Sequence, residues 1–215
     1  MNKDKNEEVE YEVKEPEVWV IREGAEQEYG ASQLFTYEDY CTWSDEERWE
    51  LIDGKAFRME APNRYHQKIS ATLFGEIYIH LKGKKCEAYH APFDVKLNVG
   101  EGKDTVVQPD ILVVCDQEKL DDKGAKGAPD LVIEILSRDT AKHDRVRKYQ
   151  KYEQYGVKEY WIVDPRLKII TVNLLNNQGK SEAKEYIGAG AITSTSLSDF
   201  NIGLETIFAD KRSGR

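Results

Sequence analysis

Apolar residues recur at helical spacing in the first half of the chain. Four of them follow one another at intervals of four positions: Ile69, Leu73, Ile77 and Leu81. This spacing is typical of an amphipathic helix, because an apolar stripe returns about every 3.6 residues. Asn63 is a suitable N-cap and Gly83 a suitable stop, so we predict a helix between them.

Two further helices are indicated by their caps and periodicity. Thr36, with Asp39 at the capping-box position, predicts a helix start near residue 36. In the stretch 138–156, Val146, Tyr149 and Tyr152 are spaced for one buried face, Ser137 or Asp139 can cap the helix, and Gly156 can end it.

The remaining apolar runs have the length of strands. Residues 110–116 and 130–137 are strand-length runs dominated by apolar residues, which is typical of strands covered on both faces. Alternation predicts a strand over 86–98, and Asp53-Gly54 predicts a hairpin turn between two short apolar runs. Strands are also expected at three further places: 158–164, 168–175 and, in the otherwise weakly patterned tail beyond Gly179, 204–208.

The order of these elements predicts the fold class. A helix, three strands, a helix and a strand follow one another, with an N-terminal helix and hairpin before them. This α-β-β-β-α-β order predicts an α/β core with a mixed sheet flanked by helices. We interpret residues 1–30 as an acidic, flexible extension and residues 31–210 as a single domain.

Composition narrows the class of protein. No apolar run approaches the roughly 20 residues needed to cross a bilayer, and the N-terminus lacks a secretory pattern, so we expect a cytoplasmic protein without a membrane partner. The three cysteines are widely spaced and odd in number, which favours buried free thiols over zinc ligands or disulfides.

The net charge of −9 at first argues against a nucleic-acid partner. Residues 1–30 hold ten acidic and four basic residues, a balance of −6, which leaves −3 for the rest of the chain. The segment 138–151 is locally basic, with six lysines and arginines against two aspartates. This basic segment is either a nucleic-acid contact or an ordinary solvated helix face.

Two carboxylates lie where a structural sequence would prefer apolar residues. Asp110 opens one apolar strand and Glu134 lies in the middle of another. Buried carboxylates need a partner, and a shared divalent cation can serve both. Asp130 is the alternative to Asp110, but it is four residues from Glu134 on one strand, roughly 13 Å away, whereas adjacent strands lie only about 4.8 Å apart. We therefore interpret Asp110 as the partner and Asp130 as a structural residue.

These residues belong to a wider pattern. Gln108-Pro109-Asp110 followed by Glu134-Ile135-Leu136 resembles the PD-(D/E)XK nuclease signature, and the match to the Uma-two family within that superfamily spans about residues 34–175. The matching segments are Glu50-Leu51-Ile52-Asp53-Gly54, His66, Pro109-Asp110, 129–137, Asp144, Lys148-Tyr149, Tyr152, Gly156-Val157 and 159–165. The resemblance implies a restriction-endonuclease-like fold, a Mg²⁺ cofactor for which Mn²⁺ can substitute, and DNA as substrate.

The chain departs from this signature at one position. Leu136 stands where the superfamily has a lysine on the same strand face as Glu134. The resemblance offers Lys148, on the following helix, for the same task of placing positive charge beside the scissile phosphate. The alternative is a solvated Asp144–Lys148 ion pair at i, i+4 spacing.

The resulting hypothesis is metal-assisted hydrolysis of a phosphodiester. Asp110 and Glu134 would hold Mg²⁺ together with the Ile135 carbonyl, and Lys148 would stabilise the negative charge that develops on the phosphate.

His66 is a candidate base or phosphate ligand, with capping or packing as its alternative. Glu50 is a candidate further acid, with a surface position as its alternative. Three residues of the basic segment are candidate phosphate contacts: Arg138, Lys142 and Arg145.

Two other functions fit the same sequence. A catalytically inactive protein of this fold could serve as a nucleic-acid-binding or assembly module, which Leu136 and the acidic net charge favour. A metal-dependent phosphohydrolase acting on a small substrate is the other. A homodimer would supply two active sites for the two strands of a duplex, although no residue identifies its interface.

Overall fold

The structure, a computed structural model, describes most of the chain. The described residues are 19–22, 25–28, 34–44, 46–59, 61–137 and 141–209, with the backbone alone described in 19–28 and 141–146.

A six-stranded mixed sheet forms the centre of the molecule. Its strand order is β14-β13-β12-β11-β8-β5. Neighbouring strands are antiparallel except β11 and β12, which are parallel. The strands are β5 (Glu87–His90), β8 (Ile111–Val114), β11 (Leu131–Ile135), β12 (Glu159–Asp164), β13 (Ile169–Leu175) and β14 (Ser181–Ile187).

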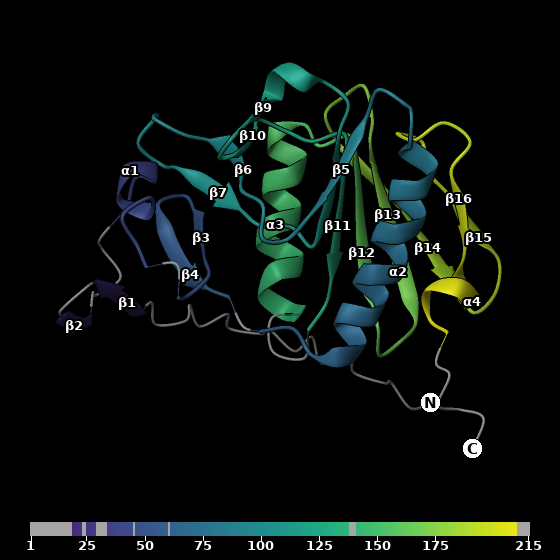
Figure 1. The fold of residues 1–215 in the computed structure, drawn as a ribbon, viewed down its shortest axis with the longest axis horizontal. Coiled ribbons are helices and arrows are strands. Elements are labelled where there is room, and N and C mark those ends of the chain that lie inside the picture. The colour runs from purple at the N-terminus through teal and green to yellow at the C-terminus, as the bar shows by residue number, and fades with distance from the viewer. Residues whose placement is uncertain are drawn as a thin grey trace, which may run out of the picture.

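A second six-stranded sheet lies beside α3 in Figure 1, with the order β4-β3-β7-β6-β10-β9. Its strands are β3 (Trp49–Ile52), β4 (Lys55–Arg58), β6 (Val95–Asn98), β7 (Thr105–Val107), β9 (Leu120–Asp121) and β10 (Gly124–Lys126). A 3-10 turn, η1 (Gln117–Lys119), precedes β9. Two hairpins complete the strands: β1 (Trp19–Arg22) with β2 (Ala25–Glu28), and β15 (Ala191–Thr193) with β16 (Asn201–Gly203).

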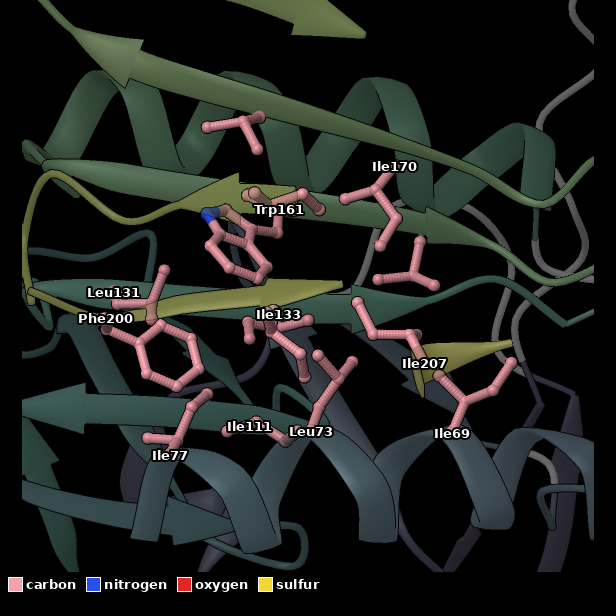
Figure 2. Packing of buried hydrophobic residues seen from close by; sticks show 14 of the residues in the cluster. Ile69, Leu73, Ile77, Ile111, Leu131, Ile133, Trp161, Ile170, Phe200 and Ile207 are labelled. Atoms are coloured by element: carbon pink, nitrogen blue, oxygen red, sulfur yellow. The ribbon is translucent and has the colours of Figure 1, made fainter. Parts of the chain in front are cut away.

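Helices cover both faces of the central sheet. The longer ones are α2 (Arg64–Leu81) and α3 (Ala141–Tyr155), and the short ones are α1 (Tyr37–Tyr40) and α4 (Leu204–Ile207). One hydrophobic cluster joins α2, α4 and the β15–β16 hairpin to one face of the sheet, where Ile69, Leu73 and Ile77 face the strands in Figure 2. A second cluster joins α3 and the second sheet to the opposite face. The α/β class with a mixed sheet flanked by helices is confirmed.

The local signals in the sequence explain several element boundaries. Thr36 and Asp39 form the predicted capping box of α1. The Asn63 side chain accepts hydrogen bonds from the first turn of α2, at Tyr65 N and His66 N. Asp53 and Gly54 join β3 to β4 with positive φ angles of 51° and 76°, the conformation that Asp-Gly turns favour.

The predicted strand over 86–98 is wrong as a single element. It divides into β5, which pairs with β8 of the central sheet, and β6, which pairs with β7 and β10 of the second sheet. The division falls at Ala91 and Pro92, where proline lacks the N–H that a sheet ladder needs.

The tail of the chain also differs from its prediction. Residues 204–208 begin with the helix α4 and not a strand, and Leu204, Ile207 and Phe208 are buried at i, i+3 and i+4, which is helical spacing. The stretch after Gly179 holds a seven-residue strand, β14, which is longer than the short pieces expected.

The prediction of three buried free thiols is wrong for Cys86 and Cys115, and for Cys41 it is right about the free thiol and wrong about burial. Cys86 and Cys115 form a disulfide, and Cys41 is free and exposed. The register of β5 with β8 pairs Glu87 with Val114, so the flanking cysteines lie opposite each other. Cysteines far apart in sequence were brought together by strand pairing that spacing alone does not reveal.

Two observations concern the ends of the chain and membranes. Strands β1 and β2 fall within the segment 1–30 that the sequence predicts as an extension, and residues 1–18 lie outside the described part of the chain. None of the helices in the described ranges combines the length and apolar character needed to cross a membrane.

Candidate active site

Strand alternation places Asp110 and Glu134 on the same face of the central sheet. Ile133 of β11 pairs with Ile111 of β8, so one further step of this antiparallel register brings Glu134 opposite Asp110. Side chains at directly opposed positions have Cβ atoms about 4.5–5.5 Å apart. The Asp110 carboxylate also accepts a hydrogen bond of 2.7 Å at Oδ2 from the Ile135 backbone N–H, which fixes it at the end of β11.

The Glu134 carboxylate is held by two residues of α3. Lys148 Nζ lies 3.0 Å from Glu134 Oε1, and the Tyr152 hydroxyl donates to the same oxygen at 2.8 Å. Both side chains are buried, and they lie one helical turn apart on one face of α3. Burial, followed by the nearby charges of Glu134 and Glu50, raises the pKa of Tyr152 well above its usual value, so this phenol stays protonated as a donor.

Glu50 joins the same cluster from the second sheet. Its Oε1 lies 2.8 Å from Lys148 Nζ and accepts a hydrogen bond of 2.7 Å from the Gln108 backbone N–H. Glu50 lies on β3, buried, so the alternative of a surface acid does not fit. Lys148 thus lies between two carboxylates that come from different sheets.

His66 lies in the first turn of α2 beside Asp110. Its Nε2 is 3.2 Å from Asp110 Oδ2. Its Nδ1 is buried and has no hydrogen-bond partner within the part of the chain that the structure describes. The ring therefore carries one nitrogen bound to the candidate metal ligand and one nitrogen without a protein partner.

One pocket of about 660 Å³ is lined by five of these side chains: Glu50, His66, Asp110, Glu134 and Lys148. It is called the catalytic pocket from here on. It is bounded by β3, β4, the start of α2, the start of β8, the ends of β11 and β12, and α3. Because β11 and β12 are parallel, their carboxyl ends meet at one edge of the sheet, as in other open α/β sheets that bind ligands there.

The structure brings together five of the residues singled out from the sequence: Glu50, His66, Asp110, Glu134 and Lys148. The alternative of a solvated pair for Lys148 does not fit, because its side chain is 3% exposed. The candidate phosphate contacts Arg138, Lys142 and Arg145 lie outside the residues whose side chains the structure describes.

Asp130 is found where a structural residue was expected. Its carboxylate accepts hydrogen bonds from Cys115 N at 2.8 Å and Lys158 Nζ at 2.6 Å, and it does not line the catalytic pocket. Burial alone would raise the pKa of Asp130, but these two donors outweigh it and lower the pKa.

Sequence reasoning missed three arginines that also line the catalytic pocket: Arg48, Arg58 and Arg166. Arg48 and Arg58 flank the hairpin that carries Glu50, and Arg166 follows the end of β12. The parallel pairing of β11 with β12 brings the residues after both strands to one edge, and no local sequence signal reveals this place of Arg166. The spacing of apolar residues predicts Tyr152 on the buried face of α3. Its position one turn after Lys148 indicates that both residues can contact Glu134.

The donor set fits a hard divalent cation. Two carboxylates from neighbouring strands, with the adjacent Ile135 carbonyl, match the small number of protein oxygens that Mg²⁺ uses before water and phosphate complete its shell. Within the described ranges, no group of three or more His, Cys, Asp and Glu side chains is arranged to hold a metal ion.

Comparisons with known proteins agree with this fold. A family model, Uma2, described as "Putative restriction endonuclease", matches residues 34–205. An uncharacterized Synechocystis protein, slr1290, is 30% identical over 117 residues, which cover 54% of this chain and 60% of that protein. The crystal structure of a putative nuclease belonging to DUF820 from Anabaena variabilis has a TM-score of 0.68 at 19% identity, over 81% of this chain and 97% of that one.

Proposed function

Because the chain belongs to the Uma2 family, described as "Putative restriction endonuclease", we propose that it is a divalent-metal-dependent endonuclease that hydrolyses phosphodiester bonds in DNA. Mg²⁺ is the proposed cofactor, and Mn²⁺ is expected to substitute for it. The family match supports nuclease function in general. The metal, the DNA substrate and the roles of the residues are what we propose beyond it.

One observation carries the proposal. Side chains from both sheets, α2 and α3 converge on a single pocket, and all five are ionisable: Glu50, His66, Asp110, Glu134 and Lys148. Burying charged groups is costly unless they are paired or bind ions. Four of these five side chains are buried: Glu50, His66, Glu134 and Lys148. A constellation of this kind, open to a pocket, is what phosphodiester hydrolysis requires.

Each residue has a proposed task. Asp110 and Glu134 would hold the metal with the Ile135 carbonyl, and the bound metal supplies Lewis-acid polarisation of the phosphate and a more acidic water. Lys148 stabilises the negative charge that develops on the phosphate oxygens. Tyr152 keeps the Glu134 carboxylate in position through its hydroxyl. His66 orients Asp110 and can accept or donate a proton at the pocket wall.

Phosphate binding is proposed for the arginines at the pocket mouth. Arg58 and Arg166 are exposed and line the catalytic pocket, so their guanidinium groups can contact the DNA backbone without reading sequence. Arg138, Lys142 and Arg145, at the start of α3, remain predicted contacts of the same kind.

Plasmid cleavage with Mg²⁺ or Mn²⁺ tests the proposal. Wild-type protein should nick or cut the plasmid, whereas Glu134→Gln should reduce the rate by at least about a hundredfold, because it weakens the metal site and the contact to Lys148. Asp130→Asn is the matched control, since Asp130 is the other aspartate that follows a proline and lies outside the pocket.

The control should cut at a rate within a few-fold of wild type after folding is verified by thermal unfolding. Equal product from wild type and Glu134→Gln would contradict the proposal. No cleavage by the folded wild type, with DNA binding retained, would instead favour the inactive binding module that Leu136 suggests.

A further inference from the structure

A second pocket, with four aromatic side chains among polar and charged ones, adjoins the catalytic pocket. It measures about 560 Å³, within the roughly 300–1,000 Å³ typical of small-molecule sites. We call it the aromatic pocket, and its wall includes Tyr37, Tyr40, Trp43 and Trp49. Tyr37 and Tyr40 stack at 6.0 Å, and Trp43 makes edge contacts with both Tyr40 and Trp49.

Two hydrogen-bond donors of residues in this wall have no partner within the described part of the chain. Trp43 Nε1 and Arg48 Nη2 are buried, and neither finds an acceptor among the residues that the structure describes. Buried donors without partners are uncommon in native proteins and call for an explanation. Both residues also contribute other atoms to the lining of the aromatic pocket.

The two pockets are connected through Arg48 and Gln108. Arg48 lines both pockets, and its Nε donates to Gln108 Oε1 at 3.0 Å. The Gln108 backbone N–H binds Glu50 of the catalytic pocket, while its side-chain amide donates to Tyr40 and Asp94 in the aromatic pocket. A ligand that reaches from one pocket to the other would therefore pass the Arg48 guanidinium.

Arg48 and Lys123 bring positive charge to the aromatic pocket, and its two carboxylates form contacts within the protein. Lys123 marks the far end and also lines a third pocket, where Lys96 and Lys126 are both paired with Asp121. Glu47 is paired with Arg58, and Asp94 accepts hydrogen bonds from Tyr40 and Gln108. An aromatic centre with cations at both ends matches a base flanked by two phosphates.

We propose that the aromatic pocket binds an unpaired nucleobase next to the scissile phosphate, so that the preferred substrate is DNA with unpaired nucleotides beside the point of cleavage. The base contacts the Tyr37, Tyr40 and Trp43 side chains, and its flanking phosphates contact Arg48 and Lys123. Aromatic stacking combined with a basic path is the general way in which proteins hold single-stranded nucleic acid. This inference rests on the proposed nuclease function for the position of the scissile phosphate.

Binding measurements separate this inference from the catalytic one. Fluorescence anisotropy compares a blunt duplex with a duplex of equal length that has a short gap in one strand, in Ca²⁺ so that binding is followed without Mg²⁺. Wild-type protein should bind the gapped DNA roughly tenfold more tightly. Tyr37→Ala and Lys123→Glu should remove most of that preference.

Lys82→Glu is the matched control, because Lys82 is an exposed lysine at the end of α2 that lines none of the three pockets. It should keep the preference for gapped DNA. Lys123 is exposed on a turn, so its variant tests the proposal even if Tyr37→Ala unfolds.

Equal binding of the two DNAs by wild type, or no binding of either, would overturn the inference, as would equal weakening of both DNAs by Lys123→Glu. Cleavage without a preference for gapped DNA would refute the aromatic pocket alone. A preference for gapped DNA without cleavage in Mg²⁺ would refute the nuclease proposal and leave the base-binding pocket standing.

Discussion

At the scale of single residues, Lys148 determines the electrostatics of the catalytic pocket. Its ammonium group lies 2.8 Å from Glu50 and 3.0 Å from Glu134, and all three side chains are buried. Removing one partner from a buried ion cluster leaves charge without compensation, which costs far more than losing an exposed pair.

Lys148→Met should therefore lower the free energy of unfolding by about 3–5 kcal/mol at neutral pH, because two buried carboxylates lose their cation. It should also abolish cleavage. Lys151→Met is the matched control on the same helix: its ammonium pairs with Asp53 at 2.7 Å, with the two side chains 14% and 42% exposed. That loss should stay below about 1 kcal/mol in urea unfolding. Equal losses in the two variants would contradict this account of the pocket.

The site residues differ in how far the sequence could reveal them. Asp110 and Glu134 were predictable because carboxylates within apolar strands need an explanation, and the family resemblance pointed to Lys148, His66 and Glu50. Arg48 and Arg166 could not be predicted in the same way. Their place at the pocket depends on which strands are neighbours, and that pairing is a property of the whole fold.

At the scale of elements, sequence patterns succeeded where the determining contacts are local. The capping box at Thr36, the Asn63 cap and the Asp53-Gly54 turn each act within a few residues, so their elements were predicted closely. The apolar stripe of α2 is long enough for its period to be unambiguous.

Elements fixed by long-range contacts were missed. The stretch 86–98 divides between two sheets, and the 204–208 segment is too short for its helical spacing to be distinguished from a strand pattern. The Cys86–Cys115 disulfide likewise depends on the pairing of β5 with β8. Partner choice among strands, and not local preference, decided the division of 86–98 and the disulfide, whereas the short length of 204–208 decided the remaining case.

Asp130 makes a prediction at this scale, because it joins the ends of three neighbouring strands. It precedes β11 and accepts from Cys115, which follows β8, and from Lys158, which precedes β12. Asp130→Asn should lower the free energy of unfolding by about 1–3 kcal/mol at neutral pH.

The pH dependence of this loss follows from the lowered pKa of Asp130. A carboxyl whose pKa is lower in the folded state stabilises the protein above its unfolded pKa of about 3.9, and the contribution disappears as the pH falls through the folded pKa. The stability gap between wild type and Asp130→Asn should thus narrow on acidification below about pH 4, as measured by urea unfolding. A gap that widens there would be inconsistent with a stabilising charged Asp130.

At the scale of the whole molecule, the catalytic pocket exists because two sheets meet across α3. In Figure 1, α3 lies between the central sheet and the second sheet. The central sheet contributes Asp110 and Glu134, the second sheet contributes Glu50, and α3 contributes Lys148, whose ammonium contacts Glu50 and Glu134. Neither sheet alone assembles the cluster. The resemblance of the backbone to the Anabaena variabilis protein, over 81% of the chain, concerns this same arrangement of sheets and helices.

Asp110 and Glu134 are the residues proposed to hold one divalent cation. Anomalous diffraction from crystals soaked in Mn²⁺ tests this proposal most directly, because the ion is located without reference to activity. We expect one strong peak within coordination distance of both carboxylates, roughly 2.0–2.1 Å as for Mg²⁺, and no peak there in Glu134→Gln. A peak bound elsewhere in the chain, with the space between residues 110 and 134 empty of metal, would contradict it.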